Sequence, residues 1–170
     1  MNPTAHRRLW AIDKNLTDRA EAELVCAAVL EALEPALHLA SLDVITDFPD
    51  LMPEHVRDAE HVLLRLALAD HPDSQRLDLP AAAAQWPAFK TYAPWSIDVD
   101  LHGQDGLLLG GFHDCGYSVT ALLTDEEAAW LQERVQSVAA VRLLEQIHTR
   151  RRHERRARRK AWFRRWLPSR

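Results

Sequence analysis

A chain of 170 residues, 47% of them hydrophobic, has the size and apolar content of one globular domain, which excludes a disordered protein. No apolar stretch approaches the roughly 20 residues that a transmembrane helix needs, so a membrane-spanning segment is excluded as well. The net charge of −4 hides a division of the chain into an acidic part and a basic part.

The division falls at residue 150. Residues 150–170 contain eleven basic residues and one acidic residue, which gives them a charge of +10. Residues 1–149 contain the other ten basic residues and twenty-four acidic residues, which gives them a charge of −14. We therefore expect an acidic α+β globular domain over 1–149 and an Arg-rich helical tail over 150–170, and the charge of the tail predicts an acidic partner.

The cysteines and the known metal motifs indicate the expected location and chemistry. Cys26 and Cys115 are expected to be free thiols in the cytoplasm, because no signal peptide precedes them. Neither Cys-x-x-Cys nor His-Glu-x-x-His occurs, so the sequence predicts no metal and no other cofactor.

The first half of the chain predicts helices. Residues 1–15 are expected to form a loosely held arm. Asp18 and Glu21 have the spacing of a capping box, and apolar residues follow at helical intervals, so residues 18–40 are predicted to form a helix that Pro35 kinks or splits.

A second helix is predicted over 53–70, because Pro53 suits a first helical turn and apolar residues again recur at helical spacing. Residues 71–94 are rich in Pro and Ala. They are expected to form a connecting segment with one short helix near 81–85.

The chain then changes to alternating patterns, which predict three strands over 96–102, 107–113 and 117–123. The alternation places one set of side chains on a single face of an antiparallel meander, even if either turn shifts by one residue at each end. These residues are Ile97, Val99, Leu101, Leu108, Gly110, Phe112, Tyr117, Val119, Ala121 and Leu123. The predicted fold class is α+β, with N-terminal helices packed on a three-stranded antiparallel meander and a long C-terminal helix.

That C-terminal helix is predicted to run unbroken over 124–165. Thr124 and Glu127 have capping-box spacing at its start, and its apolar stripe stops at Ile147. At ~1.5 Å per residue the helix would be about 63 Å long. A body of about 150 residues is only about 38 Å across, so we expect the basic end to project as an extension.

The basic end is the predicted binding surface. Like charges four residues apart repel, so the free tail is expected to fray until an anionic partner binds. Arginine around a helix axis with interleaved tryptophan favours phosphate contacts and stacking on bases, which predicts a non-enzymatic protein that binds RNA or DNA. The residues expected to contact nucleic acid are Arg150, Arg151, Arg152, Arg155, Arg156, Arg158, Arg159, Lys160, Trp162, Arg164, Arg165 and Trp166.

Two other kinds of partner fit the charge pattern less well. A helix on a membrane surface needs one apolar face, which only residues 161–167 offer. A protein partner is the main alternative. The acidic body could bind and block a basic protein, as an immunity protein or antitoxin does, and the tail could bind an acidic protein or the body itself.

One constellation suggests catalysis. In the strand over 96–102, Asp98, Asp100 and His102 lie on one face, about 6.6 Å apart in succession. Two carboxylates and an imidazole can hold a divalent cation, so a metal-dependent nuclease is a second alternative. The competing interpretation, which we favour, is the polar face of a half-exposed edge strand.

Overall fold

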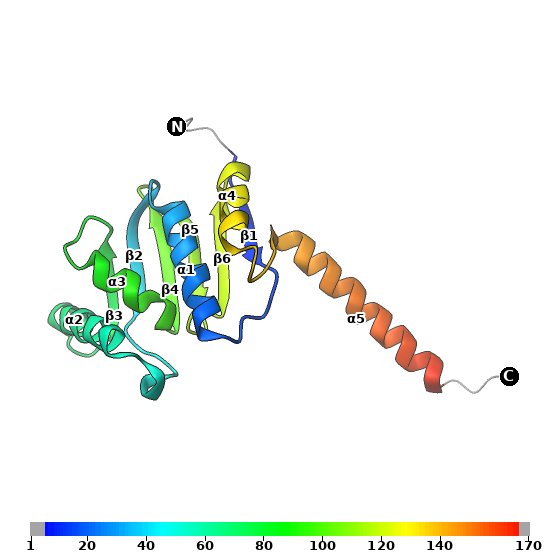
Figure 1. The fold of residues 1–170 in the computed structure, drawn as a ribbon, viewed down its shortest axis with the longest axis horizontal. Helices are drawn as coiled ribbons and strands as arrows, with labels where there is room; N and C mark the ends of the chain where they lie inside the picture. Colours follow the sequence, from blue (N-terminus) through cyan, green and yellow to red (C-terminus); the bar gives the residue numbers. More distant parts are fainter. Residues whose placement is uncertain (1–5, 167–170) are drawn as a thin grey trace.

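The computed structural model describes residues 6–166, with side chains up to Arg159 and that of Trp162. The strands are β1 (Arg8–Ile12), β2 (Leu37–Asp43), β3 (Arg76–Pro80), β4 (Asp98–Gly103), β5 (Leu108–His113), β6 (Ser118–Leu123) and β7 (Val141–Leu143). The α-helices are α1 (Arg19–Leu33), α2 (Glu54–Asp70), α3 (Trp86–Tyr92), α4 (Asp125–Val135) and α5 (Leu144–Trp166), and two short 3-10 helices are η1 (Pro49–Leu51) and η2 (Ala93–Trp95). In this range the strands form one antiparallel sheet in the order β3-β2-β4-β5-β6-β1-β7 (Figure 1).

One face of the sheet, called the inner face, carries the core. Helices α1 and α4 lie across it, and α2 and α3 pack at its β3 end (Figure 1). One row of paired residues crosses all seven strands on this face: Leu79, Ala40, Leu101, Gly110, Ala121, Trp10 and Leu143. Gly110 has to be glycine, because a Cβ there would lie 2.7 Å from the carbonyl oxygen of Thr120.

The opposite face, called the outer face, is polar. The neighbouring row of paired residues crosses it from strand to strand: Asp78, Ser41, Asp100, Gly111, Thr120, Ala11 and Arg142. Successive residues of a strand point to opposite faces, so this row follows directly from the inner one. Acidic side chains gather on its β3–β4 side, and the basic Arg142 lies at its β7 end, where α5 begins.

The predicted meander exists as β4, β5 and β6, but the predicted fold built on it is wrong. The three strands are the centre of a seven-stranded sheet, and the N-terminal half contributes strands as well as helices. The predicted alternation holds where Val99 pairs with Phe112 and Phe112 with Val119. It fails at Leu108, which is 51% exposed, because a bulge beside Leu101 turns Leu109 inward instead.

Residues 8–12, expected in a loose arm, form β1 between β6 and β7. The predicted helix over 18–40 stops at Leu33, and the chain continues as β2 from Leu37. Pro35 therefore ends the helix and does not merely kink it, since proline lacks the amide hydrogen that a helix needs.

The prediction of a connecting segment over 71–94 is wrong in two places. Residues 76–80 form β3, and the short helix is α3, whereas residues 81–85 form turns before it. In contrast, the helix predicted over 53–70 is confirmed as α2.

The predicted helix over 124–165 is two helices, α4 and α5, with β7 between them. The capping box at the start of α4 is present. The break contains neither glycine nor proline. The side chain of Gln132 holds it, donating to the carbonyl oxygen of Ala139 (3.3 Å) and accepting from the amide of Val141 (2.8 Å). Residues 141–143 pair with β1, and this pairing satisfies backbone hydrogen-bonding groups of both strands. A continuous helix would leave that side of β1 unpaired.

Candidate nucleic-acid interface

Helix α5 is attached to the body only at its first turns, here called the foot. Ile147 is 2% exposed and packs against the body, together with the half-buried Leu144. From His148 to Arg159 every side chain is exposed, and so is Trp162. The helix therefore runs away from the sheet (Figure 1), as expected from the end of its apolar stripe.

An ion-pair cluster around Asp13 fixes the direction in which α5 leaves. The carboxylate of Asp13, with its side chain 5% exposed, accepts two hydrogen bonds from Arg150 and lies 3.0 Å from Nε of Arg142. The hydrogen bonds from Arg150 lower the pKa of Asp13, and the charge of Arg151 acts in the same direction. One carboxylate thus faces three guanidinium groups, which leaves the foot of α5 with a net positive charge.

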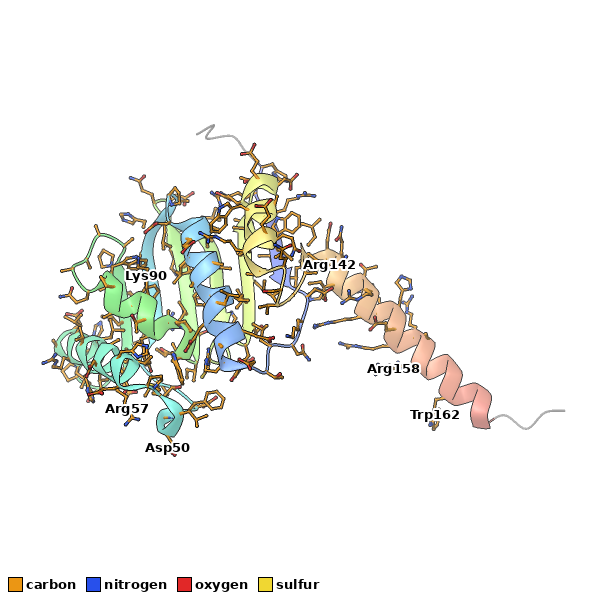
Figure 2. All side chains as sticks on the ribbon, viewed as in Figure 1. Asp50, Arg57, Lys90, Arg142, Arg158 and Trp162 are labelled. Atoms are coloured by element: carbon orange, nitrogen blue, oxygen red, sulfur yellow. The ribbon has the colours of Figure 1, made fainter. Side chains whose placement is uncertain are left out.

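Five arginines and one histidine form a single face of α5, here called the arginine stripe. Its members line a groove of about 480 Å³: His148, Arg151, Arg152, Arg155, Arg156 and Arg159. The steps between them are three or four residues, so the side chains stack along one side of the helix. Figure 2 shows the outer part of α5, with Arg158 and Trp162, standing clear of the body.

The arginine stripe makes no close ion pairs among the described residues, although Asp13 interacts with the charge of Arg151 at longer range. Within the described side chains, the ion pairs of α5 all involve Arg150, which contacts Asp13 and, at 3.5 Å, Glu154. None of the five stripe arginines makes an ion pair among the described residues. Their charge is therefore directed to solvent.

The structure sorts the residues expected to bind nucleic acid into three groups. Arg150 is held by the body. The five stripe arginines share one face, and the exposed Arg158 and Trp162 lie four residues apart beside it. The backbone of Lys160, Arg164, Arg165 and Trp166 belongs to α5, but their side chains are outside the described residues.

Two features of this site were missed in the sequence. His148 belongs to the arginine stripe, although the charge run starts only at Arg150. Its spacing of three and four residues from Arg151 and Arg152 was the available signal. The pairing of Asp13 with Arg150 had no signal, because it joins residues 137 positions apart.

The strand residues considered for catalysis do not form a metal site. Nη1 of Arg76 lies 3.6 Å from Asp98, and its Nη2 lies 3.3 Å from Asp100. Asp98 is also hydrogen-bonded at 2.5 Å to Nδ1 of His113, and His102 joins neither carboxylate. Among the described residues, no three His, Cys, Asp or Glu side chains are grouped closely enough to hold a metal ion.

Comparisons of the chain with protein-family models, with curated proteins and with solved structures found no match. Within residues 6–166 no helix has both the length and the apolar content that crossing a bilayer requires.

Proposed function

We propose that this protein is a non-enzymatic, cytoplasmic protein that binds nucleic acid with the arginine stripe of α5. The observation that carries the proposal is the set of five arginines on one helix face, none of them in an ion pair among the described residues. Guanidinium groups form paired hydrogen bonds with phosphates, and a row of phosphates offers a partner to each arginine.

The repulsion between the stacked arginines of the stripe supports an anionic partner. Arg151, Arg155 and Arg159 follow one another at four-residue intervals, and each like-charge pair destabilises a helix by roughly 0.2–0.5 kcal/mol. Solubility alone does not require charges stacked on one face. A polyanion removes this repulsion, so binding and helix stability are expected to be coupled.

A nucleic acid fits the described part of α5 better than a membrane surface does. A helix that lies on a membrane buries an apolar face, and from His148 to Arg159 the described helix has none. Trp162 is 58% exposed and lies one turn beyond Arg158, where an indole ring can stack on an unpaired base. The cytoplasmic location rests on Cys26 and Cys115, which are buried and unpaired, as is usual in a reducing compartment.

The test removes charge from the stripe and compares it with equal charge removed elsewhere. In the stripe variant, Arg151, Arg155 and Arg159 are changed to Gln. In the control, three exposed basic residues of α2 and α3 are changed to Gln: Arg57, Arg65 and Lys90. Affinity for a labelled single strand and for a duplex is measured by fluorescence anisotropy over a series of salt concentrations.

The stripe variant should lose most of its affinity, and its salt dependence should become shallower. Each phosphate contact contributes about 0.7 (single strand) or 0.9 (duplex) to the slope of log K against log salt, so losing three contacts lowers the slope by about 2 to 3. The control should keep both affinity and slope. Equal losses in the two variants would show that net charge, and not the stripe, is responsible.

If neither variant nor the unmodified protein binds nucleic acid, the proposal fails. The acidic body then becomes the functional part, as in the immunity-protein alternative. Its outer face, where Asp43, Asp78 and Asp100 lie on three neighbouring strands, is the surface that would bind a basic protein.

A further inference from the structure

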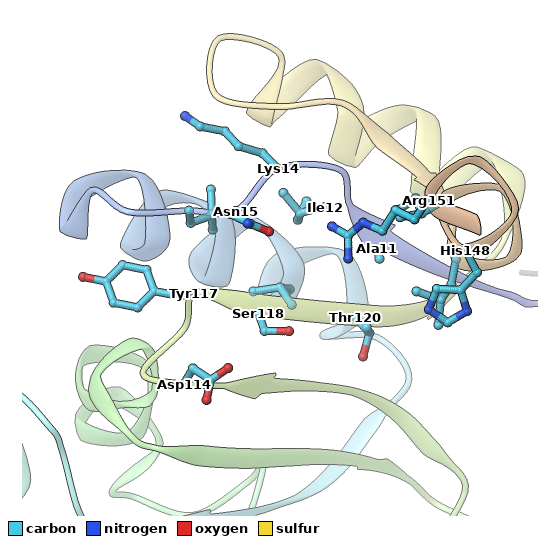
Figure 3. Close-up of a pocket in the computed structure, with 14 residues that line it drawn as sticks. Ala11, Ile12, Lys14, Asn15, Asp114, Tyr117, Ser118, Thr120, His148 and Arg151 are labelled. Atoms are coloured by element: carbon cyan, nitrogen blue, oxygen red, sulfur yellow. The ribbon is translucent and has the colours of Figure 1, made fainter. Parts of the chain in front are cut away.

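A polar cavity of about 390 Å³ lies where α5 leaves the body (Figure 3). Strand β6 forms its floor with Ser118 and Thr120, the segment after β1 forms one wall with Asn15, and the foot of α5 closes it with His148 and Arg151. Its volume is within the range of small-molecule sites, about 300–1,000 Å³.

Most of the polar side chains that line this cavity form no hydrogen bond with the described residues. The side chains of Asn15, Ser118, Thr120 and His148 make no hydrogen bond with any described residue. Lys14, at the rim, is paired with Glu21 at 2.6 Å. The available groups are therefore hydroxyl and amide groups on the floor and wall, with the guanidinium of Arg151 and the imidazole of His148 at the α5 end.

The two ends of the cavity differ in charge. Arg151 and His148 lie together at one end, and Asp114 lies beyond Ser118 at the other (Figure 3). Ser118 and Thr120 are two residues apart on β6, about 6.8 Å, so the ends are separated by roughly the length of a small ligand. A ligand with an anionic group at one end and a hydrogen-bond donor at the other matches this polarity.

Thr120 pairs with Gly111 on β5. A Cβ on Gly111 would lie 2.8 Å from the carbonyl oxygen of Val99 and 3.2 Å from Nε2 of His113, so only glycine fits there. The imidazole ring of His113 therefore lies beside Gly111 and borders the floor next to Thr120.

Asp114 is held in place by the turn between β5 and β6. Both Asp114 (φ 53°) and Cys115 (φ 56°) adopt the left-handed conformation, which is strained for residues other than glycine. Arg19 stabilises this turn by donating to the carbonyl oxygen of Cys115 at 2.7 Å while it stacks on Trp95 and Tyr117. The carboxylate of Asp114 is thus presented by a rigid backbone.

The cavity continues into the groove of the arginine stripe, because His148 and Arg151 line both. Arg151, Arg155 and Arg159 follow at intervals of about 6 Å along the helix. A strand whose phosphates lie on the stripe therefore reaches the cavity at Arg151.

We propose that this cavity binds one nucleotide of a single strand that the arginine stripe holds. Its phosphate lies at Arg151 and His148, its base lies over Ser118 and Thr120, and an exocyclic amino group of the base donates to Asp114. Cytosine and adenine carry such a group, and thymine presents a carbonyl oxygen at the equivalent position. The cavity therefore prefers cytosine to thymine. This inference rests on the proposed function of α5 and adds base preference to it.

The experiment compares oligo(dC) and oligo(dT) strands of about 12 nucleotides, within the usual site sizes of such proteins. Anisotropy is measured on the full chain, on Asp114→Asn and on the control Asp73→Asn, an exposed acid in the turn before β3. Asparagine suits the left-handed backbone of position 114 and keeps the size of the side chain, so the variant should fold.

The full chain and Asp73→Asn should bind oligo(dC) at least about fivefold more tightly than oligo(dT), the lower end of what one good base contact provides. Asp114→Asn should bring the ratio close to one, because its amide can donate to thymine as well as accept from cytosine. The salt dependence should not change, since the stripe is intact.

A second measurement locates the site. Cytidine 5′-monophosphate added to the ¹⁵N-labelled full chain should shift the amide signals of Ser118 and Thr120, and uridine 5′-monophosphate should shift them less. Binding that depends on the stripe but shows equal affinity for both strands, unaltered by Asp114→Asn, would overturn the nucleotide site and leave the proposed function standing. No binding of either strand would instead contradict the proposed function.

Discussion

Helices α4 and α5 follow one another within ten residues and are held in opposite ways. Helix α4 buries Ala128, Leu131 and Val135 against the inner-face core and begins with a complete capping box. Helix α5 buries Ile147 in its foot and is otherwise held by the cluster around Asp13. The first helix is stabilised by the body along its length, whereas the second is exposed from His148 to Arg159.

The difference shows that a helical pattern in the sequence does not by itself predict whether the helix is buried. Both segments consist mainly of residues that favour helix, so helix propensity alone does not separate them. What differs is how far the buried face extends: α4 buries Ala128, Leu131 and Val135 along its length, whereas α5 has Ile147 buried at its start and exposed side chains from His148 to Arg159. Most helical stability in proteins comes from packing an apolar face, so α5 is expected to be the less stable helix in the free protein.

The largest contrast between the helices should come from truncating one side chain in each. Leu131→Ala removes a buried side chain of α4 and should lower the free energy of unfolding by about 3 kcal/mol. Arg158→Ala, in the exposed part of α5, should change it by less than about 0.5 kcal/mol. Urea denaturation followed by circular dichroism measures both, and comparable losses would show that α5 is packed more extensively than its exposure indicates.

A smaller effect should separate the capped helix from the uncapped one. Thr124 accepts from the amide of Glu127 at 3.2 Å, and Glu127 accepts from the amide of Thr124 at 2.8 Å. Thr124→Ala should therefore cost about 1 kcal/mol of unfolding free energy. The matched control is Thr149→Ala in α5, which makes no cap and should stay within a few tenths of a kcal/mol. If the capping box does not stabilise α4, the two variants will have the same midpoint of urea denaturation.

Lowering the pH should have the smallest effect on global stability, but it should clearly destabilise the start of α5. Arg150 lowers the pKa of Asp13 below its ordinary value of 3.8, so the stabilisation is complete above that value and is lost as pH falls through the lower pKa of the folded protein. Hydrogen-exchange protection factors of residues 144–151 should fall over that window. In Asp13→Asn they should be low at every pH and show no such step, whereas Asp73→Asn should resemble the unmodified protein.

How much of the fold was predictable depended on whether each pattern was local. The strands β4 to β6 and helix α2 follow from alternation, turn residues and helical spacing within a short window. Residues 8–12 form a strand because they pair with β6 on one side and with residues 141–143 on the other. The paired residues lie more than 100 positions apart in the sequence, so no local pattern predicts these strands. Leu37 continues an apolar helical pattern in sequence, so only its pairing in the sheet identifies β2.

The candidate site was predictable to the same extent. The arginine run marked α5 as the binding element, and helical spacing placed Arg151, Arg155 and Arg159 together. The cavity at the foot was not predictable, because Asn15, Asp114 and Thr120 come from three segments that only the sheet brings together. Asp98 and Asp100 resemble a metal site in sequence, but in the fold Arg76, from another strand, contacts both carboxylates.

The two edges of the sheet also restrict how this protein can assemble. Edge strand β3 ends at Pro80, which has no amide hydrogen to donate, and carries the outward-facing charges of Arg76 and Asp78. Edge strand β7 has three residues and turns at once into α5. Charged, proline-ended or very short edges resist the addition of further strands. Polymerisation by strand addition is thus disfavoured at both ends of the sheet.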